Sequence, residues 1–333
     1  MEIPNKLLLD IYDSAQHCGV NEYNEYALRT LKKVLHFDSA AVVDFSVTEE
    51  QKLVIQGLHL HAAPLEKLLD RPKTVGTEML DKSGAVRSRD KILTKALARR
   101  GKSVVVDIAE SFSDPTILRY CRKYDTAHSL TFIAGQTPAG SIPAVALWRA
   151  TRKNAYTDAH GAAADLLLPH LVHGNQINKR LALSSSSKPV GRSVAFATPD
   201  GVLYLVEPEV IRLLQREWSQ WTPPFLPSVL MDALRQDREM VYAGRAISVR
   251  ASLQAHAICL VITAHERETP ALTRAEQRVA SLAAQGLQYK EIAQLLGVSP
   301  ATIRNQLHSA YSKLGVSNKT SLAGVLQSLR QST

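Results

Sequence analysis

Two short polar runs, each closed by a proline, divide this chain and indicate that it does not form one continuous core. The first run is Ser184-Ser185-Ser186-Ser187-Lys188-Pro189, and the second is His265-Glu266-Arg267-Glu268-Thr269-Pro270. Clusters of serine, charged residues and proline between periodic segments are typical of linkers. A chain of 333 residues is also long enough for two or three domains. We therefore predict domains at 1–183, 193–264 and 271–333, with linkers at 184–192 and 265–270.

The first domain alternates helical and extended patterns. Apolar residues at helical spacing, or a helix-start signal, predict helices at 7–15, 23–35, 89–99, 114–120 and 157–183. Short apolar runs predict strands at 37–45, 52–60, 103–108, 129–135 and 144–150. Helices and strands that alternate in this way predict an α+β domain.

The second domain is shorter and predicted to be a small α+β fold. Two candidate strands at 193–197 and 202–206 flank Pro199-Asp200-Gly201, whose Asp-Gly pair is typical of a hairpin turn. Helices are predicted at 209–218 and 228–235, and closing strands at 240–250 and 254–264.

The last domain is predicted to be all helix. Four helical patterns at 273–285, 289–296, 299–314 and 318–329 are separated by Gly286, Gly297 and Gly315, which stand where helices end. Ser299 is a favourable cap for the third helix, and Pro300 is favourable at its first position because the missing N–H has no partner there.

This third helix has two faces of different chemistry. At 100° per residue, Ile303, Leu307, Ala310, Tyr311 and Leu314 fall on one side, and Arg304, Asn305 and His308 fall on another. A helix of this kind, after a short helix and a tight turn, has helix-turn-helix spacing. Arginine pairs with guanine and asparagine with adenine in the major groove of DNA.

The charge distribution points to the same partner. The formal net charge is +9. Residues 271–333 hold seven basic and two acidic residues, so they carry +5 of that excess. A basic domain favours a partner rich in phosphates. We expect phosphate contacts, which set the register on the duplex, at Lys290, Ser299, Thr302, Lys313 and Lys319.

The motifs of this domain also resemble a known family. They are Leu272-Thr273-Arg274-Ala275-Glu276, Ala284-Gln285-Gly286-Leu287, Lys290-Glu291-Ile292-Ala293, Leu296-Gly297-Val298-Ser299-Pro300-Ala301-Thr302-Ile303-Arg304-Asn305, and Lys313-Leu314-Gly315-Val316 followed by Asn318-Lys319-Thr320. With this spacing the segment from residue 272 to about residue 326 resembles the LuxR-type (GerE) DNA-binding domain. It departs from the family at Ala275, where an arginine is usual, and at Gln306, where a histidine is usual.

The resemblance implies a four-helix domain and a bacterial, cytoplasmic transcriptional regulator that binds duplex DNA as a homodimer. It assigns base reading to Arg304, Asn305 and His308, and phosphate contacts to Lys290, Thr302, Lys313 and Lys319. The last helix would make the dimer contact, and its apolar stripe is Leu322, Val325, Leu326 and Leu329. The expected partners are duplex DNA and a second copy of the chain, with a small-molecule effector and RNA polymerase as further candidates and no membrane partner.

The first two domains are candidates for the regulatory part. Residues 1–183 resemble a GAF-like domain through the strand start Phe37-Asp38-Ser39-Ala40 and Pro169-His170-Leu171, and residues 193–264 resemble a PAS-like domain through their hairpin and closing strands. Two alternatives stay open. One is a quorum-sensing regulator of the acyl-homoserine-lactone type. The other is an interaction scaffold that uses an apolar face of the helix at 157–183, with Ala164, Leu167, Leu168, Leu171, Ile177 and Leu181, and binds DNA only secondarily.

Other residue clusters favour structural roles. His59 and His61 point the same way on a predicted strand, and His170 and His173 lie three apart on a helix, but neither pair has a third ligand at suitable spacing. Cys18, Cys121 and Cys259 are far apart and predict no disulfide framework. The sequence contains no phosphate-binding loop motif and no Ser-His-Asp arrangement typical of a catalytic triad. We therefore expect no enzyme activity and no cofactor, and the histidine pairs give no reason to expect a metal site.

Overall fold

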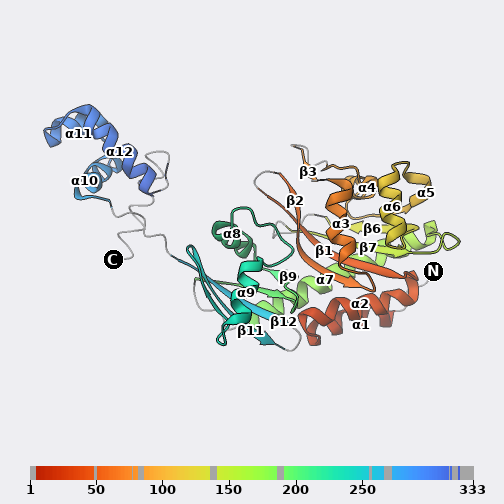
Figure 1. Ribbon diagram of the computed structural model, residues 1–333. Helices are drawn as coiled ribbons and strands as arrows, with labels where there is room; N and C mark the ends of the chain where they lie inside the picture. The colour runs from red at the N-terminus through yellow and green to blue at the C-terminus, as the bar shows by residue number, and fades with distance from the viewer. Residues whose placement is uncertain are drawn as a thin grey trace. The chain divides into compact units, whose positions relative to one another are not determined.

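The computed structural model describes residues 5–48, 51–76, 78–81, 86–135, 141–185, 191–254, 257–265, 272–314, 316 and 322. The chain forms two compact units, Met1–Ala264 and His265–Thr333. Figure 1 shows their helices and strands. No described helix has the length and apolar character needed to span a membrane.

A five-stranded antiparallel sheet is the centre of the first half of the larger unit. Its strand order is β2-β1-β7-β6-β5. The strands are β1 (Ser39–Val47), β2 (Leu53–His61), β5 (Ser103–Asp107), β6 (His128–Ile133) and β7 (Ile142–Arg149). Two short strands, β3 (Met79–Leu80) and β4 (Val86–Arg87), pair separately. The sheet confirms the predicted α+β class.

Both faces of this sheet are buried, because β1 directs apolar side chains to each of them. Ala40 and Val42 face one core, while Ala41, Val43 and Phe45 face another. Helices α1 (Asn5–His17), α2 (Val20–Leu35) and α7 (Asp158–Ser185) cover the first face. The second face is covered by α3 (Glu66–Val75), α4 (Lys91–Ala98), α5 (Ile108–Ser111) and α6 (Pro115–Lys123), as Figure 1 shows.

Helix α7 corrects two predictions. Four of the six residues expected on its partner face, Ala164, Leu167, Leu168 and Leu171, are fully buried against α1, α2 and the sheet. Ile177 packs against the same core and is partly buried, whereas Leu181 is exposed. The helix also continues through Ser184 and Ser185, which we expected in a linker, and residues 186–190 lie outside the described part of the chain. The face was assigned wrongly because its covering helices are more than a hundred residues away in the sequence.

A second sheet has the same strand order as the first. Its order is β10-β11-β12-β8-β9, and all its pairings are antiparallel. The strands are β8 (Arg192–Ala197), β9 (Leu203–Val206), β10 (Val241–Ala243), β11 (Ile247–Gln254) and β12 (Ala257–Ala264). When the five strands of each sheet are numbered in chain order, both sheets have the order 2-1-5-4-3. Helices α8 (Pro208–Glu217) and α9 (Ser228–Gln236) pack on one face, and Ala182 and Leu183 of α7 pack on the other.

The strand predicted at 240–250 is in fact two strands with a turn between them. The Glu217 carboxylate accepts hydrogen bonds from the backbone N–H groups of Arg245 (2.9 Å) and Ala246 (2.5 Å) and from the Tyr242 hydroxyl (3.1 Å). These bonds stabilise the turn at Gly244, where a Cβ atom would lie 2.5 Å from the Glu217 carboxylate. The turn depends on a residue of α8, so local patterning did not show it.

The smaller unit consists of three helices in its described part. They are α10 (Arg274–Ala284), α11 (Tyr289–Leu296) and α12 (Pro300–Leu314). Their common core comprises Val279, Ala280, Ala283, Ile292, Ala293, Ile303, Leu307, Ala310 and Leu322. Most of the fourth predicted helix, at 318–329, lies outside the described residues.

Helix α7 contains a glycine that close packing requires. A Cβ atom at Gly174 would overlap the hydroxyl of Tyr23 and lie 2.8 Å from Tyr23 Cζ. Tyr23 is fully buried and donates a hydrogen bond to the Leu171 carbonyl oxygen (3.2 Å), so its ring has no free space to move into. At Gly161 of the same helix, a Cβ atom would make only an ordinary contact of 3.7 Å with Val105.

We expect Gly174→Ala to destabilise the larger unit by about 1–3 kcal/mol, because overpacking outweighs the gain in helix propensity of about 1 kcal/mol. Gly161→Ala is the matched control and should be neutral or stabilising. Urea denaturation of both variants tests this. Equal or greater stability of Gly174→Ala would show that the tyrosine moves at little cost.

Candidate nucleic-acid interface

Helix α12 begins at a well-formed turn after α11. Gly297 ends α11 in the left-handed conformation, with φ of 66°, which glycine adopts without steric cost. Ser299 Oγ accepts a hydrogen bond from the Thr302 backbone N–H (3.1 Å) and lies 2.8 Å from Thr302 Oγ1. Pro300 is the first residue of the helix. The sequence signals that predicted this start therefore act as expected.

The two faces predicted for α12 are present. Ile303, Leu307 and Ala310 are buried in the core of the unit. Arg304, Asn305 and His308, which we expected to read bases, are all exposed. Within the described part of the unit, no other element buries the face that carries these hydrogen-bond donors.

Tyr289 at the start of α11 lies beside Arg304. The guanidinium carbon is 5.4 Å from the centroid of the tyrosine ring, which is within the range of a cation–π contact. Sequence reasoning did not single out Tyr289, because the two residues lie fifteen positions apart on different helices. The contact limits the orientations that the Arg304 side chain samples.

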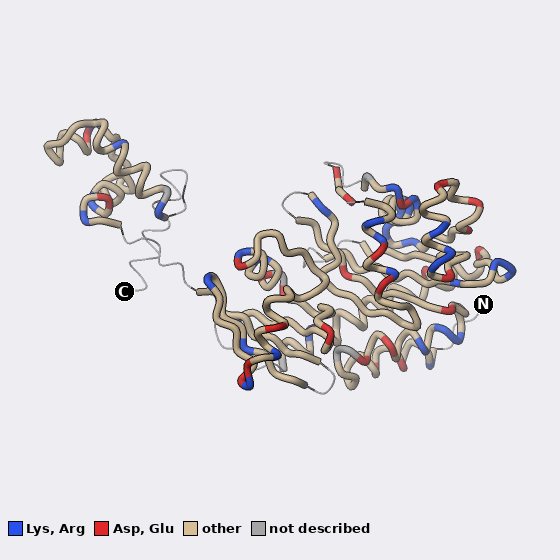
Figure 2. Tube along the Cα trace, viewed as in Figure 1, with Lys and Arg blue, Asp and Glu red and all other residues tan. Residues whose placement is uncertain are grey.

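The residues expected to bind phosphates fall into three groups. Lys290, Ser299 and Thr302 are exposed. Lys313 is only half-buried but is already paired, because its Nζ lies 2.6 Å from Glu276 Oε2. Lys319 lies outside the described residues. Figure 2 shows the lysine and arginine positions along the chain.

The dimer stripe predicted on the last helix is corrected at one position. Leu322 is fully buried in the core of the unit and is not available to a partner. Val325, Leu326 and Leu329 lie outside the described residues. The core of three short helices is small, and Leu322, which lies in the fourth predicted helix, is part of it.

Glu276 holds α10 and α12 together. Its carboxylate accepts hydrogen bonds from the Thr273 backbone N–H (2.7 Å), Ser309 Oγ (2.6 Å) and Lys313 Nζ (2.6 Å). The Thr273 hydroxyl in turn accepts from the Glu276 N–H (3.2 Å), which completes a capping box. The Lys313 ammonium, followed by the hydrogen bonds from Ser309 and Thr273, lowers the pKa of Glu276 to about 2. The Thr-x-x-Glu spacing at 273–276 is a signal that sequence analysis could have used.

Comparison with known proteins agrees with this geometry. Residues 270–326 match the family described as "Bacterial regulatory proteins, luxR family". The C-terminal unit is a LuxR-family DNA-binding domain. The chain is therefore a DNA-binding transcription regulator, as predicted from the motifs of residues 272–326. No curated protein matches the chain.

Several solved structures are similar to the chain at low identity. The N-acylhomoserine lactone-dependent LuxR family transcription factor CepR2 of Burkholderia cenocepacia is 16% identical over 53% of this chain and 97% of its own, with a TM-score of 0.38. SdiA of Escherichia coli is 10% identical over 97% of this chain and 96% of its own, also with a TM-score of 0.38. A GAF domain/HD domain protein of Geobacter sulfurreducens is 16% identical over 51% of this chain and 99% of its own, with a TM-score of 0.33.

The histidine pairs singled out in the sequence have protein partners. His59 and His61 point the same way, as predicted. His59 Nε2 lies 3.4 Å and His61 Nδ1 3.0 Å from the Glu25 carboxylate on α2. Tyr12 of α1 contacts both His170 and His173, and its hydroxyl lies 2.8 Å from His170 Nδ1. Both pairs therefore join α7 or β2 to the helices at the N-terminus.

We expect Glu276→Gln to destabilise the DNA-binding unit at pH 7, because the neutral amide cannot pair with the Lys313 ammonium. The native pKa of Glu276 lies below its ordinary value of 4.5, so its stabilising effect is complete above pH 4.5 and is lost as the pH falls toward 2. The difference between wild type and variant should shrink over the same range.

Hydrogen exchange of the α10 and α12 amides in the full chain measures this. The matched control is Glu291→Gln, which removes an exposed acid of the same unit that caps α11 and has no cation partner among the described residues. Equal protection of wild type and Glu276→Gln at pH 7 would contradict the role given to this carboxylate.

Proposed function

We propose that this protein is a cytoplasmic regulator that binds duplex DNA as a homodimer, with α12 in the major groove. In this proposal the larger unit is a non-enzymatic sensory part that controls DNA binding through a small-molecule effector. The exposed face of α12, with Arg304, Asn305 and His308, is the observation that carries the proposal. It lies opposite the buried stripe that anchors the helix in its unit.

The chemistry of the exposed face suits base recognition. Arginine can donate two hydrogen bonds to guanine O6 and N7, and asparagine can bond adenine N6 and N7. Arg304 lies against Tyr289, so less side-chain entropy is lost when its guanidinium docks. The orientation of this side chain is thus partly set before DNA is bound.

The residues around the base-reading face suit phosphate binding. The first N–H groups of α12 have no helical acceptor, and a helix N-terminus attracts anions. The Ser299 and Thr302 hydroxyls are at this terminus, and Lys290 is exposed near the start of α11. We therefore propose that these three residues hold the duplex backbone. Lys313 has a smaller share than its sequence position suggests, because Glu276 already neutralises it.

We expect Arg304→Ala and Asn305→Ala each to weaken binding to the specific DNA site by about 1–3 kcal/mol, with little change in non-specific binding. Both side chains are exposed, so the unit should stay folded. The matched control is Arg278→Ala, which removes an exposed arginine from α10. Fluorescence anisotropy with specific and scrambled duplexes measures the specific and the non-specific affinity. If both variants bind the specific site with wild-type affinity, residues other than Arg304 and Asn305 read the bases.

We expect Lys290→Ala to weaken binding to specific and scrambled duplexes equally and to lower the slope of log K against log salt by about one. Lys313→Ala should change this slope less, and should instead reduce hydrogen-exchange protection of α10, because it removes the partner of Glu276. A loss confined to the specific duplex in Lys290→Ala would mean that this lysine contacts a base.

The proposed homodimer rests on the sequence stripe that remains after Leu322 is assigned to the core. Leu326→Asp should shift the full chain from dimer to monomer in sedimentation experiments and weaken binding to a two-half-site duplex at least tenfold. Leu322→Asp should instead unfold the unit, since it places a charge in the core. A fully dimeric Leu326→Asp protein with unchanged DNA affinity would exclude this contact.

The scaffold alternative loses its main support. Most of the apolar stripe of α7 that was to bind a partner is buried inside the larger unit by α1, α2 and the sheet, and only Leu181 of its six residues is exposed. An effector-controlled regulator needs no partner on that face. It needs an internal site whose occupation changes the stability of the larger unit.

A further inference from the structure

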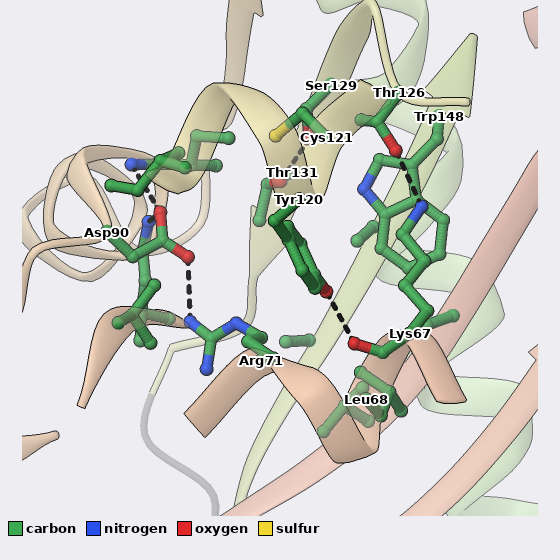
Figure 3. Close-up of a pocket in the computed structure, with 18 of the residues that line it drawn as sticks. Lys67, Leu68, Arg71, Asp90, Tyr120, Cys121, Thr126, Ser129, Thr131 and Trp148 are labelled. Carbon is green, nitrogen blue, oxygen red and sulfur yellow. Dashed lines mark hydrogen bonds and ion pairs between the residues drawn. The ribbon is translucent and has the colours of Figure 1, made fainter. Parts of the chain in front are cut away.

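A cavity of about 130 Å³ lies between the first sheet and the helices on its second face. Most of its wall is apolar and includes Val43, Phe45, Leu93, Ile117 and Ile133. Figure 3 shows that α3 and α6 contribute side chains from opposite sides, and that Trp148 of β7 closes one end. The volume is close to that of cavities of about 150 Å³ that bind benzene in a protein core.

One wall residue is a buried lysine without a carboxylate partner. Lys67 of α3 is only 3% exposed. Its Nζ donates a hydrogen bond to Thr126 Oγ1 (2.8 Å) and lies 3.4 Å from the centroid of the Trp148 ring, as Figure 3 shows. No ion pair of Lys67 occurs among the described residues. A buried ammonium that lacks a counter-ion is costly, and it favours any anion that can reach it.

The neighbouring cation has a different environment. Arg71, one turn further along α3, is paired with Glu78 (2.6 Å) and Asp90 (2.7 Å). The other oxygen of Asp90 accepts from the backbone N–H groups of Ile92 and Leu93 at the start of α4. Both acids are thus engaged by other groups, and neither can turn to Lys67 without breaking these bonds.

Two hydroxyl groups also line the cavity. Ser129 and Thr131 of β6 line the wall, with their side-chain oxygens 3.1 Å apart, and Ser129 pairs with Trp148 across the strands. Tyr120 has no such freedom, because its hydroxyl donates to the Lys67 carbonyl oxygen (2.5 Å). The Ser129 and Thr131 hydroxyls are therefore the candidate donors to a second oxygen of an anion in this cavity.

We propose that this cavity binds a small apolar carboxylate of about the size of benzoate, with the carboxylate on Lys67 Nζ and the hydrocarbon part among the apolar wall residues. The charge of the lysine selects the anion over neutral amides and lactones of the same shape. The proposal rests on the proposed sensory role of the larger unit only for the effect of the ligand on DNA binding. The binding step itself can be tested separately.

The protonation of Lys67 adds a signature to this binding. Burial lowers the pKa of Lys67 to about 7, and the charge of Asp125, which follows α6, opposes this lowering. Burial also raises the pKa of the Cys121 thiol to about 11, so this thiol stays neutral between pH 6 and 8.5. The other ionisable groups nearby are Asp90, Asp125 and Arg71, and the ion pairs of Arg71 with Asp90 and Glu78 raise its pKa despite burial, so its guanidinium stays charged over this range. A bound carboxylate favours the charged lysine, so binding should weaken at the higher pH.

Calorimetric titration of the full chain with benzoate and with its neutral isostere benzamide tests the proposal. We expect benzoate to bind at least tenfold more tightly than benzamide at pH 6, and to bind severalfold more weakly at pH 8.5 than at pH 6. Saturating benzoate should raise the melting temperature by several degrees. Absence of benzoate binding, or equal binding of the two probes, would overturn the proposal.

Two variants test separately the charge of Lys67 and the volume of the cavity. Lys67→Met keeps the volume and removes the charge, and it should reduce benzoate affinity to the level of benzamide while melting no lower than wild type. Ala146→Leu narrows the cavity, keeps the lysine and should weaken both probes. Lys95→Met, on the exposed side of α4, is the matched control and should bind as wild type does. Full benzoate affinity in Lys67→Met would overturn the proposal.

The outcome is distinguishable from failure of the proposed function. Arg304→Ala should bind benzoate as wild type does, because Arg304 belongs to the other compact unit. If benzoate binds but leaves DNA affinity unchanged, the cavity assignment stands and its regulatory role is wrong. If benzoate does not bind, the DNA-binding tests on α12 are unaffected.

Discussion

The burial of both faces of one antiparallel sheet is the constraint on which the larger unit depends. Strand β1 alternates Ala40 and Val42 with Ala41, Val43 and Phe45, so neither face can be left in water. Helices must therefore cover both sides, and they do so differently. The helices α1, α2 and α7 pack closely on one face, as the overlap expected at Gly174 shows. The shorter helices on the other face leave a cavity.

Three cationic side chains, Arg149, Arg71 and Lys67, are buried or partly buried in the larger unit, and each has different partners. Arg149 is 2% exposed, and its guanidinium donates to the carbonyl oxygens of Leu35 and His36 at the end of α2, so helix carbonyls stabilise its charge. Arg71 is neutralised by two carboxylates. In the part of the chain that the structure describes, the Lys67 ammonium contacts only a hydroxyl and an aromatic ring. Among these three, the lysine alone faces a cavity without a compensating acceptor charge, which is why a ligand is expected at that point.

The DNA-binding unit meets a different difficulty, because three short helices bury little surface. A carboxylate with three hydrogen-bonded partners helps to compensate for this small core, since Glu276 caps α10 through the Thr273 N–H and holds Ser309 and Lys313 of α12. The same interaction pairs Lys313, a residue expected to contact phosphate, with a carboxylate of its own unit. The face of α12 that is proposed to read bases is exposed, while the opposite face is buried in the core of the unit.

Local chemistry in the sequence determined much of this protein by itself. Serine, proline and glycine at 297–300 set the start of α12, and the period of 3.6 separated Arg304 and Asn305 from Ile303 and Leu307. The core strands and the long helices were likewise readable from period and caps. Helix α3 was missed because Pro72 interrupts its pattern, and with it the cavity lysine. Only the tertiary structure decided that most of the α7 stripe is internal, that Leu322 belongs to a core, that Glu276 claims Lys313 and that Lys67 lacks a carboxylate. Each of these depends on groups from distant elements, and burial and pairing are properties of neighbours that the local sequence does not specify.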